Sequence, residues 1–435
     1  MWHPYTRAST LAEGAVPIIV RGEGIYLIDD AGRRYVDAIS SWWCAALGHG
    51  HPRLVAAIQR QAAELQHSIL ANLTHPQAAE LARRLAHLMP SPDRHVLFAS
   101  DGASAVEQAL KISVQYWSNV GRPQKRRFAC LHGAYHGDTL GAMAVGYLDE
   151  WHRPFKPMLA EAVQLAIGNC QLPIQELARH RDELAAVIVE PLCLGAAGMR
   201  MYPAEHLRAL GDWCKANEVL LIVDEIAMGF GRTGRWFAFE HAGVDPDLVC
   251  VGKALTGGTL PMSATIAKDF LHATFTDQPV DHTLQHGHTF CGNPIAAAAA
   301  NEALQIYGEI DAPARAAELG ARLARRLEPL RGQPGIADVR SLGLIGVVEL
   351  EPEAATACRP PSSGDAPFSG GRRAVGVDPA SPSRPHRIRL RLQNDGILLR
   401  PLGNVLYLMP PLVISEQELD ALADAFVSAI REECC

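Results

Sequence analysis

Two short apolar runs in the middle of the chain predict strands that are buried on both faces. Residues 219–223 are all aliphatic, and residues 248–251 are aliphatic apart from one cysteine. Such runs, bounded by polar residues, are typical of strands inside a parallel sheet. Asp224 directly follows the first run, and Gly252 and Lys253 follow the second. Ligands bind to open α/β sheets beyond the carboxyl ends of the strands, so we expect Asp224 and Lys253 to lie at that edge.

A junction between a strand and a helix is predicted near residue 100. Residues 95–99 have the apolar pattern of a strand, residues 100–103 are typical of a turn, and a helix is expected from Ser104 onward. Ser104 and Glu107 have the spacing of a capping box. Because the free N–H groups at the start of a helix attract anions, the glycine-containing turn is a candidate phosphate site. An ordinary helix start would show the same pattern.

Helical spacing of apolar residues predicts further helices around this core. Residues 52–65 and 76–88 each begin with a proline, which is favoured in the first turn of a helix. A third helix, rich in alanine, is expected after the loop that ends at Pro294. Alternating helices and buried strands favour an α/β fold with a mainly parallel central sheet. We expect this large domain to span residues 51–310.

The two ends of the chain are predicted to form a smaller α/β domain from residues 1–50 and 311–435. Strand-forming residues flank a turn at residues 29–32, which predicts a hairpin. After about Asp311 the pattern predicts a helix and then two strands. Residues 358–385 are rich in Pro, Ser and Gly without periodicity, so we interpret them as an insertion.

The composition narrows the class of protein. The chain has 435 residues, of which 48% are hydrophobic and 20% charged, and its net charge is −7. These values are ordinary for a globular protein, and a negative net charge disfavours nucleic acid as a partner. No apolar run approaches the length of a membrane span, and the N-terminus lacks the apolar core of a signal peptide. The ten cysteines lack metal-ligand spacing, so we expect reduced thiols, a cytoplasmic location and no metal.

A carboxylate and a lysine at one sheet edge suit the chemistry of pyridoxal 5′-phosphate. This cofactor withdraws electrons only while its pyridine nitrogen is protonated, and a neighbouring carboxylate keeps it so. A lysine is needed to bind the aldehyde and to move protons after the substrate has displaced it. Asp224 and Lys253 are the candidates for these two tasks. A lysine in a surface turn is the commoner interpretation, but Lys253 lies between a buried strand and the segment Ala254–Gly258.

A competing interpretation lies in the same stretch. Residues 229–234 match the pattern G-x-G-x-x-G, which after a strand is the fingerprint of dinucleotide binding. That function also requires a helix to begin at the glycines, and the next residues, Arg235–Phe239, do not have the pattern of a helix start. A dinucleotide-dependent oxidoreductase therefore remains the minor alternative.

Longer motifs resemble the class III aminotransferases of fold type I. DEIAMGFGRTG contains Asp224, and GKALTGG contains Lys253. The other matching motifs are WHPYT near the N-terminus, SSWW at residues 40–43, AYHGDT at residues 134–139 and RPLGNVLYLMPP at residues 400–411. Within that family, the motifs resemble the group that converts 8-amino-7-oxononanoate to 7,8-diaminononanoate in biotin synthesis. The resemblance runs from Trp2 to about Ser428, apart from the insertion.

The resemblance implies a role for each matched position. Lys253, Asp224 and Tyr135 would be catalytic, with Tyr135 stacked on the cofactor ring. The residues implied to bind the cofactor are Gly102, Ala103, Tyr135, Asp224, Lys253, His288 and Thr289. The residues implied to bind substrate are Tyr5, Trp42, Tyr135, Lys253, Gly287 and Arg400. An arginine at a strand end is more often part of a surface ion pair, but the matched family arginine binds the carboxylate of the keto substrate.

The resemblance also implies partners. It predicts a homodimer with active sites at the interface, in which Thr289 binds the phosphate of the partner's cofactor. The implied amino donor is S-adenosyl-L-methionine; lysine as the donor, or an ω-aminotransferase with another acceptor, is the alternative. The chain departs from the family pattern at Ala103, Leu194 and His288, where relatives carry serine, glutamine and proline. At these three positions the resemblance does not define the contacts to the cofactor and the donor.

Overall fold

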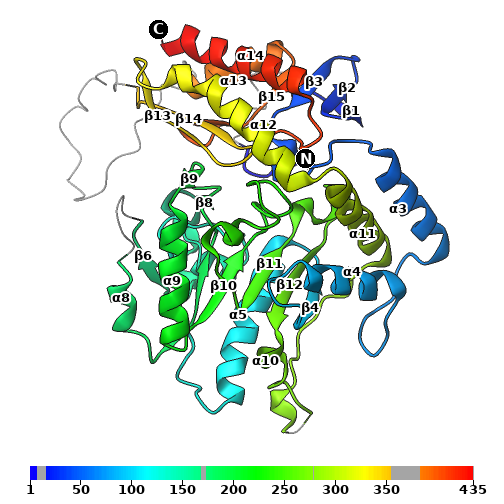
Figure 1. Ribbon diagram of the computed structural model, residues 1–435, viewed down its shortest axis with the longest axis vertical. Coiled ribbons are helices and arrows are strands. Elements are labelled where there is room, and N and C mark those ends of the chain that lie inside the picture. The colour runs from blue at the N-terminus through cyan, green and yellow to red at the C-terminus, as the bar shows by residue number, and fades with distance from the viewer. Residues whose placement is uncertain (7–15, 168–172, 278, 354–382, 435) are drawn as a thin grey trace.

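A seven-stranded sheet forms the centre of the computed structural model, which describes residues 1–6, 16–167, 173–277, 279–353 and 383–434 (Figure 1). The strand order is β4-β12-β11-β10-β7-β5-β6. The strands are β4 Arg94–Ala99, β5 Arg127–Leu131, β6 Val163–Leu165, β7 Leu184–Val189, β10 Leu220–Asp224, β11 Leu248–Val251 and β12 Ser263–Lys268. Only β12 runs antiparallel to its neighbours within this sheet. The predicted α/β fold with a mainly parallel sheet is confirmed.

Both faces of this sheet are buried. Leu220 and Ile222 of β10 belong to the apolar core beneath helix α5 (Gly102–Asn119). Leu221 and Val223 point to the other face, where the core includes residues of helix α9 (Ala204–Ala216). Successive side chains of a strand point to opposite faces, so a strand covered on both sides needs an apolar residue at every position. This explains the continuous runs in the sequence.

Three helices pack together beside the sheet (Figure 1). They are α3 (Pro52–Glu64), α4 (Pro76–His87) and α11 (Pro294–Glu309). Both predicted helices before residue 90 are confirmed and end one residue earlier than expected. The side chain of Asn293 caps α11 by accepting the N–H groups of the second and third helical residues. The shorter helices are α2 Ser40–Trp43, α6 Leu140–Ala144, α7 Asp149–His152, α8 Gln175–Ala178 and α10 Asp269–His272.

The predicted capping of α5 is wrong. The helix begins at Gly102, and the carboxylate of Asp101 accepts the N–H of Ser104 at 3.0 Å and its hydroxyl at 2.9 Å. Glu107 instead accepts the N–H of Gly141 at 2.8 Å. Aspartate is at least as good an N-cap as serine, so the earlier of two possible caps starts the helix.

The two ends of the chain come together in the upper part of Figure 1. Two small sheets have the orders β1-β2-β3-β15 and β13-β14-β16. Strand β15 pairs in parallel with β3, which joins Ile397 to Val36. The predicted hairpin is confirmed as β2 and β3. The elements are β1 Ile19–Glu23, β2 Tyr26–Asp29, β3 Arg34–Asp37, β13 Ile336–Ser341, β14 Gly346–Leu350, β15 Ile397–Leu398, β16 Val405–Leu408, α12 Ala312–Leu327, α13 Arg384–Asn394 and α14 Glu416–Cys434. Most of the predicted insertion, residues 358–385, lies outside the described residues.

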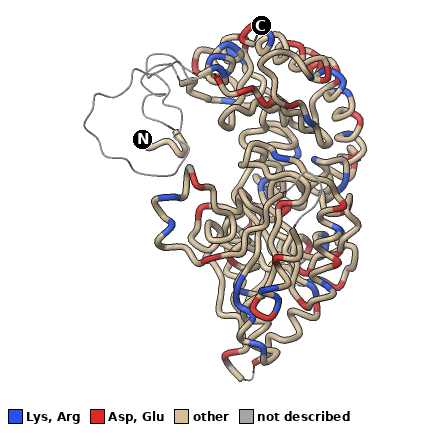
Figure 2. Tube along the Cα trace, turned by 90° about the vertical axis from the view of Figure 1, so that its left-hand side faces the viewer, with Lys and Arg blue, Asp and Glu red and all other residues tan. Residues whose placement is uncertain are grey.

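Basic and acidic residues are mixed along the chain. Figure 2 shows Lys and Arg interspersed with Asp and Glu along the trace in this view. Among the described residues, no helix has the length and apolar character that crossing a membrane requires.

Candidate active site

A cavity of about 460 Å³ lies at the carboxyl ends of the parallel strands. Its walls come from the segments that follow β4, β5, β7, β10 and β11. The lining residues are Trp43, Asp101, Gly102, Ala103, Tyr135, His136, Gly137, Asp138, Thr139, Glu190, Asp224, Ile226, Ala227 and Lys253. The structure thus brings Asp224 and Lys253 to one cavity, together with Gly102, Ala103 and Tyr135.

Asp224 is held in one orientation from two sides. It ends β10 and is only 5% exposed. One carboxylate oxygen, Oδ2, lies 2.7 Å from Nδ1 of the buried His136, and Oδ1 accepts the N–H of Ile226 at 3.0 Å. The other ring nitrogen of His136, Nε2, is buried and has no hydrogen-bond partner within the described part of the chain. This fixed anion is suited to pair with a cationic group in the cavity.

Lys253 supplies the amine. Gly252 separates it from the end of β11, and it begins the short helix η3 (Lys253–Thr256). Its Nζ lies 4.8 Å from the centroid of the Trp43 ring. Burial lowers the pKa of Lys253, while the negative charges of Asp224 and Glu190 act in the opposite direction. An amine with a lowered pKa is a better nucleophile and proton carrier near neutral pH than a surface lysine.

The start of α5 forms another wall of the cavity. The first backbone hydrogen bond of the helix runs from the N–H of Ala105 to the carbonyl of Asp101, so the N–H groups of Gly102 and Ala103 precede the regular helical bonding. Gly137 packs directly on this turn: it has a φ of +123°, and a Cβ there would lie 2.4 Å from Cβ of Ala103. Only glycine allows this approach. Gly102 and Ala103 line the cavity, so the helix N-terminus is a candidate site for an anion.

Tyr135 is fixed from both ends. Its backbone N–H donates to Oε1 of Glu190 at 2.9 Å, and its hydroxyl donates to Oδ2 of Asp138 at 3.0 Å. Glu190 also accepts the N–H of Gly195 at 2.9 Å, and burial raises its pKa to about 7. Leu194, the residue at the family's glutamine position, is fully buried in β8 (Cys193–Leu194) and is not part of the cavity wall.

Tyr5, Trp42 and Arg400 form a second group at the mouth of the cavity. The hydroxyl of Tyr5 donates to Oδ1 of Asp138, a cavity residue, at 2.5 Å. The guanidinium of Arg400 lies 4.6 Å from the centroid of the Trp42 ring and donates to the carbonyl of Tyr5 at 2.6 Å. Trp151 completes the group, with its ring 5.3 Å from that of Tyr5. The group presents a cation surrounded by aromatic rings.

Gly287, His288 and Thr289 are not brought to this cavity within their own chain. Nδ1 of His288 lies 3.2 Å from the hydroxyl of Ser100, while Gly287 and Thr289 are exposed. The neighbouring Phe290 is 62% exposed, which is unusual for a large aromatic residue. This exposed segment is therefore a surface that could meet another chain.

The dinucleotide interpretation of residues 229–234 is wrong. These residues do not line the cavity, and the next element, η2 (Ala238–Ala242), is a single short turn rather than the helix that a dinucleotide requires. The carbonyl of Arg232 accepts the N–H of Leu344, so this loop packs against the unit formed by the chain ends.

Sequence reasoning missed two residues of the site and underrated a third. The motif AYHGDT contains His136 but does not indicate its function, and no motif contains Trp151. Of the two adjacent tryptophans, Trp42 was assigned to the substrate pocket, whereas Trp43 lines the cavity. A histidine next to a glycine-flanked tyrosine was the one available signal for His136.

Glu225 provides a prediction about stability. It is fully buried, its Oε1 accepts the N–H of Phe239 at 2.9 Å, and burial raises its pKa to about 8. The folded chain therefore binds a proton at the Glu225 carboxyl group more tightly than the unfolded chain does. The resulting stability is complete below the ordinary glutamate pKa and is lost as the pH rises toward 8. We expect thermal midpoints of Glu225→Gln to fall less between pH 5 and 8 than those of the wild type.

Differential scanning calorimetry across that pH range measures this effect. The exposed Glu161 offers a matched control, because Glu161→Gln should retain the wild-type pH dependence. Identical pH dependence in the wild type and in Glu225→Gln would contradict the argument.

Comparisons with known proteins match this chain over nearly its whole length. Residues 10–430 match the family described as aminotransferase class-III. The adenosylmethionine-8-amino-7-oxononanoate aminotransferase of Synechococcus elongatus is 37% identical over 99% of this chain and 98% of its own. That of Geobacter sulfurreducens is 35% identical over 99% and 95%. The crystal structure of the Methanocaldococcus jannaschii enzyme of that name has a TM-score of 0.89, with 33% identity over 99% of this chain and 97% of that one. A PLP-bound amine transaminase from an uncultivated Pseudomonas species has a TM-score of 0.88, with 31% identity over 100% and 99%.

Proposed function

We propose that this chain, which belongs to the class-III aminotransferases, transfers an amino group to 8-amino-7-oxononanoate and forms 7,8-diaminononanoate. The relatives that carry this name cover almost the whole chain. The observation that carries the proposal is the shared cavity of Asp224 and Lys253 at the carboxyl ends of two neighbouring strands. Biotin synthesis is the pathway that this reaction serves.

The cofactor is pyridoxal 5′-phosphate, and the cavity residues fit it. The N–H groups of Gly102 and Ala103 at the start of α5 suit the phosphate. The carboxylate of Asp224 suits the pyridine nitrogen, and the ring of Tyr135 suits the flat face. Bound here, the cofactor supplies an electron sink that stabilises negative charge on the carbon next to the amine.

The chain's own residues then divide the work of proton transfer and positioning. Lys253 would hold the cofactor through its aldehyde, and its amine would carry a proton at the substrate carbon. Asp224 would keep the pyridine nitrogen protonated, and His136, 2.7 Å from Asp224, orients this carboxylate. Tyr135 holds the ring plane because Glu190 and Asp138 fix it at both ends.

The group at the mouth of the cavity provides the substrate site. Arg400 binds the carboxylate of the keto substrate, and Tyr5 and Trp42 cover its chain. The contact between Arg400 and Trp42, with the guanidinium 4.6 Å from the ring centroid, supports this role because it leaves the charged group oriented by a rigid ring.

A homodimer completes the proposed site. Gly287, His288 and Thr289 lie outside the cavity of their own chain, and Thr289 is exposed. In the dimer, Thr289 and His288 of one protomer reach the cofactor phosphate of its partner, and Gly287 reaches the substrate.

The division into a large domain, residues 51–310, and a small domain from both chain ends is also part of the proposal. So is a cytoplasmic location, which four buried free thiols support: Cys130, Cys193, Cys214 and Cys250.

The amino donor in the proposal is S-adenosyl-L-methionine, with lysine as the competing donor. A sulfonium is a fixed cation, which the electron-rich rings of Trp42 and Trp43 would attract. Mixing the cofactor-loaded enzyme with each donor alone, without the keto substrate, tests this assignment. We expect adenosylmethionine to change the cofactor's absorption spectrum and lysine to leave it unchanged. A response to lysine alone would overturn the donor assignment and leave the aminotransferase function intact.

Arg400 provides a prediction about the acceptor. Truncating it in Arg400→Ala should raise the KM for 8-amino-7-oxononanoate by about 10- to 100-fold, because a charge-assisted hydrogen bond to a carboxylate contributes about 1.5–3 kcal/mol. The turnover number should change less. Steady-state kinetics with the keto substrate varied measures both values. Arg400→Lys should recover part of the affinity, and the exposed Arg179→Ala serves as the control. An unchanged KM in Arg400→Ala would remove Arg400 from the substrate site.

A further inference from the structure

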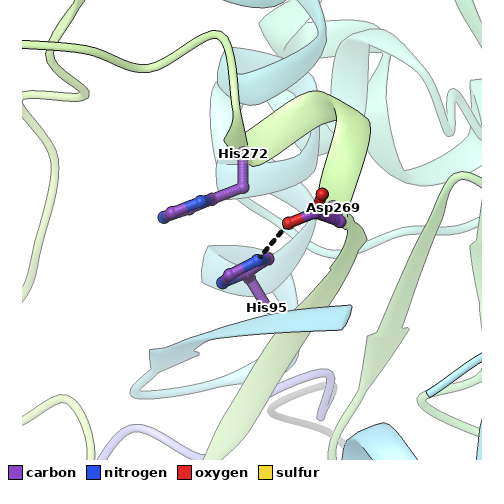
Figure 3. Close-up of side chains that lie close together, drawn as sticks. All are labelled: His95, Asp269 and His272. Carbon is purple, nitrogen blue, oxygen red and sulfur yellow. Dashed lines mark hydrogen bonds and ion pairs between the residues drawn. The ribbon is translucent and has the colours of Figure 1, made fainter. Parts of the chain in front are cut away.

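Two histidines and an aspartate gather at the edge of the sheet opposite the cavity. His95 lies at the amino end of the edge strand β4, whereas the cavity residues Gly102 and Ala103 follow the carboxyl end of that strand. Asp269 and His272 are the first and last residues of α10, which directly follows β12. The three side chains face one another in Figure 3. None of them takes part in the proposed reaction.

The pairing of β4 with β12 fixes the backbones of this group. Lys268 stands opposite Arg94 in the antiparallel pair, and the N–H of Asp269 donates to the carbonyl of Asp93 at 3.2 Å. Nε2 of His95 lies 2.8 Å from Oδ1 of Asp269. The rings of His95 and His272 stack with their centroids 3.7 Å apart and an angle of 8° between the planes. Donors from two elements are therefore held together by the sheet itself.

We propose that His95, Asp269 and His272 form a binding site for a divalent transition-metal ion such as Zn²⁺. Two imidazoles and one carboxylate are a donor set that zinc and its neighbours prefer, whereas Mg²⁺ and Ca²⁺ prefer oxygen donors. One donor atom from each residue can be chosen so that all three lie within 4.8 Å of one another. The ion would join the edge strand β4 to α10 and leave its remaining positions to water.

An imidazole binds a metal ion in the plane of its ring, so the stacked rings of His95 and His272 must rotate out of their parallel arrangement to close the site. Two donors on one tetrahedral zinc ion are about 3.4 Å apart, given metal–nitrogen distances of about 2.0–2.1 Å. The side chains of His95 and Asp269 are 43% and 62% exposed, so they can rotate without disturbing the core. The nearby cation, Lys268, is already paired with Asp245 and Asp247 at 3.1 and 3.2 Å.

Protection of histidines from chemical modification tests the proposal, because zinc bound by cysteines elsewhere does not affect this measurement. Cofactor-loaded enzyme is treated with diethyl pyrocarbonate at increasing Zn²⁺ concentrations, and modified histidines are mapped by mass spectrometry. We expect Zn²⁺ to protect His95 and His272 with the same concentration dependence. The exposed His87 should stay reactive, and Mg²⁺ should protect none of the three.

Single substitutions make the test specific. We expect the zinc concentration that protects His95 to rise by at least about tenfold in His272→Ala and in Asp269→Asn. His87→Ala should leave it unchanged, and all variants should retain aminotransferase activity because the group lies at the opposite edge of the sheet. Unaltered reactivity of His95 in saturating Zn²⁺ would overturn the proposal. So would protection of His95 that persists unchanged in His272→Ala.

Discussion

Replacing Lys253 with alanine is expected to lower turnover by at least about 10⁴-fold while leaving the fold intact. In the proposed mechanism the lysine amine is required twice, to bind the cofactor's aldehyde and to carry the proton, and alanine can do neither. The side chain lines the cavity next to Trp43 and lies outside the apolar core, so its loss should not destabilise the protein. Lys253→Arg should be equally inactive, because a guanidinium stays protonated and is a poor nucleophile.

Turnover assays and cofactor mapping together test this prediction. Borohydride traps the cofactor on the lysine that holds it, and peptide mapping then identifies that lysine. We expect the label on Lys253 in the wild type and in Lys215→Ala, a control at an exposed position of α9. A label on any other lysine would contradict the assignment.

Asp224→Asn should lower kcat/KM by about 10³-fold, or about 4 kcal/mol. Asparagine has the shape of aspartate and can still accept the N–H of Ile226, so the pocket should keep its form. The neutral amide, however, cannot stabilise a protonated pyridine nitrogen, and the loss of a charge costs more in a dry cavity than in water. The substitution should also hold His136 less firmly, because the ring of His136 faces Oδ2 of Asp224.

The kinetics of Asp224→Asn should be measured with the cofactor at saturation, so that weaker cofactor binding does not add to the effect. Asp212→Asn, at an exposed position of α9, is the matched control and should behave as the wild type. A variant of Asp224 that remains within tenfold of the wild type, a difference of about 1.4 kcal/mol, would show that this carboxylate does not pair with the pyridine nitrogen.

The parts of the site that follow buried strands could be predicted from the sequence. Strands β10 and β11 are covered on both faces, so their apolar runs are continuous and their ends are sharp. The ends of the two apolar runs therefore indicate the positions of Asp224 and Lys253. The start of α5 was predicted two residues late, because Asp101 and Ser104 are both good caps and sequence spacing does not decide between them.

His136 could not be predicted in the same way. It lies on the segment after β5, whereas its partner Asp224 ends β10, and strand β7 separates the two in the sheet. The contact joins positions 88 residues apart. No local pattern encodes such a pairing, which depends on the order of strands in the sheet.

The orientation of the two tryptophans was also beyond sequence reasoning. Residues 40–43 form a turn in which all four φ angles are positive, between 46° and 74°, although none of the four is glycine. A left-handed conformation costs about 1–2 kcal/mol per residue, so no propensity predicts it. One local and two long-range hydrogen bonds hold the turn: Ser41 donates to Asp37, Ser40 donates to the carbonyl of Met409, and Trp43 donates to the hydroxyl of Tyr407. This turn directs Trp43 to the cavity and Trp42 to Arg400.

The most direct test of the proposed function is a single-product assay. Purified enzyme loaded with pyridoxal 5′-phosphate is incubated with 8-amino-7-oxononanoate and with adenosylmethionine or lysine, each labelled with ¹⁵N at its amino groups. The product is then analysed by mass spectrometry. We expect 7,8-diaminononanoate that carries one ¹⁵N atom from adenosylmethionine, and no such product from the Lys253→Ala variant. Absence of labelled 7,8-diaminononanoate with both donors would contradict the proposed function.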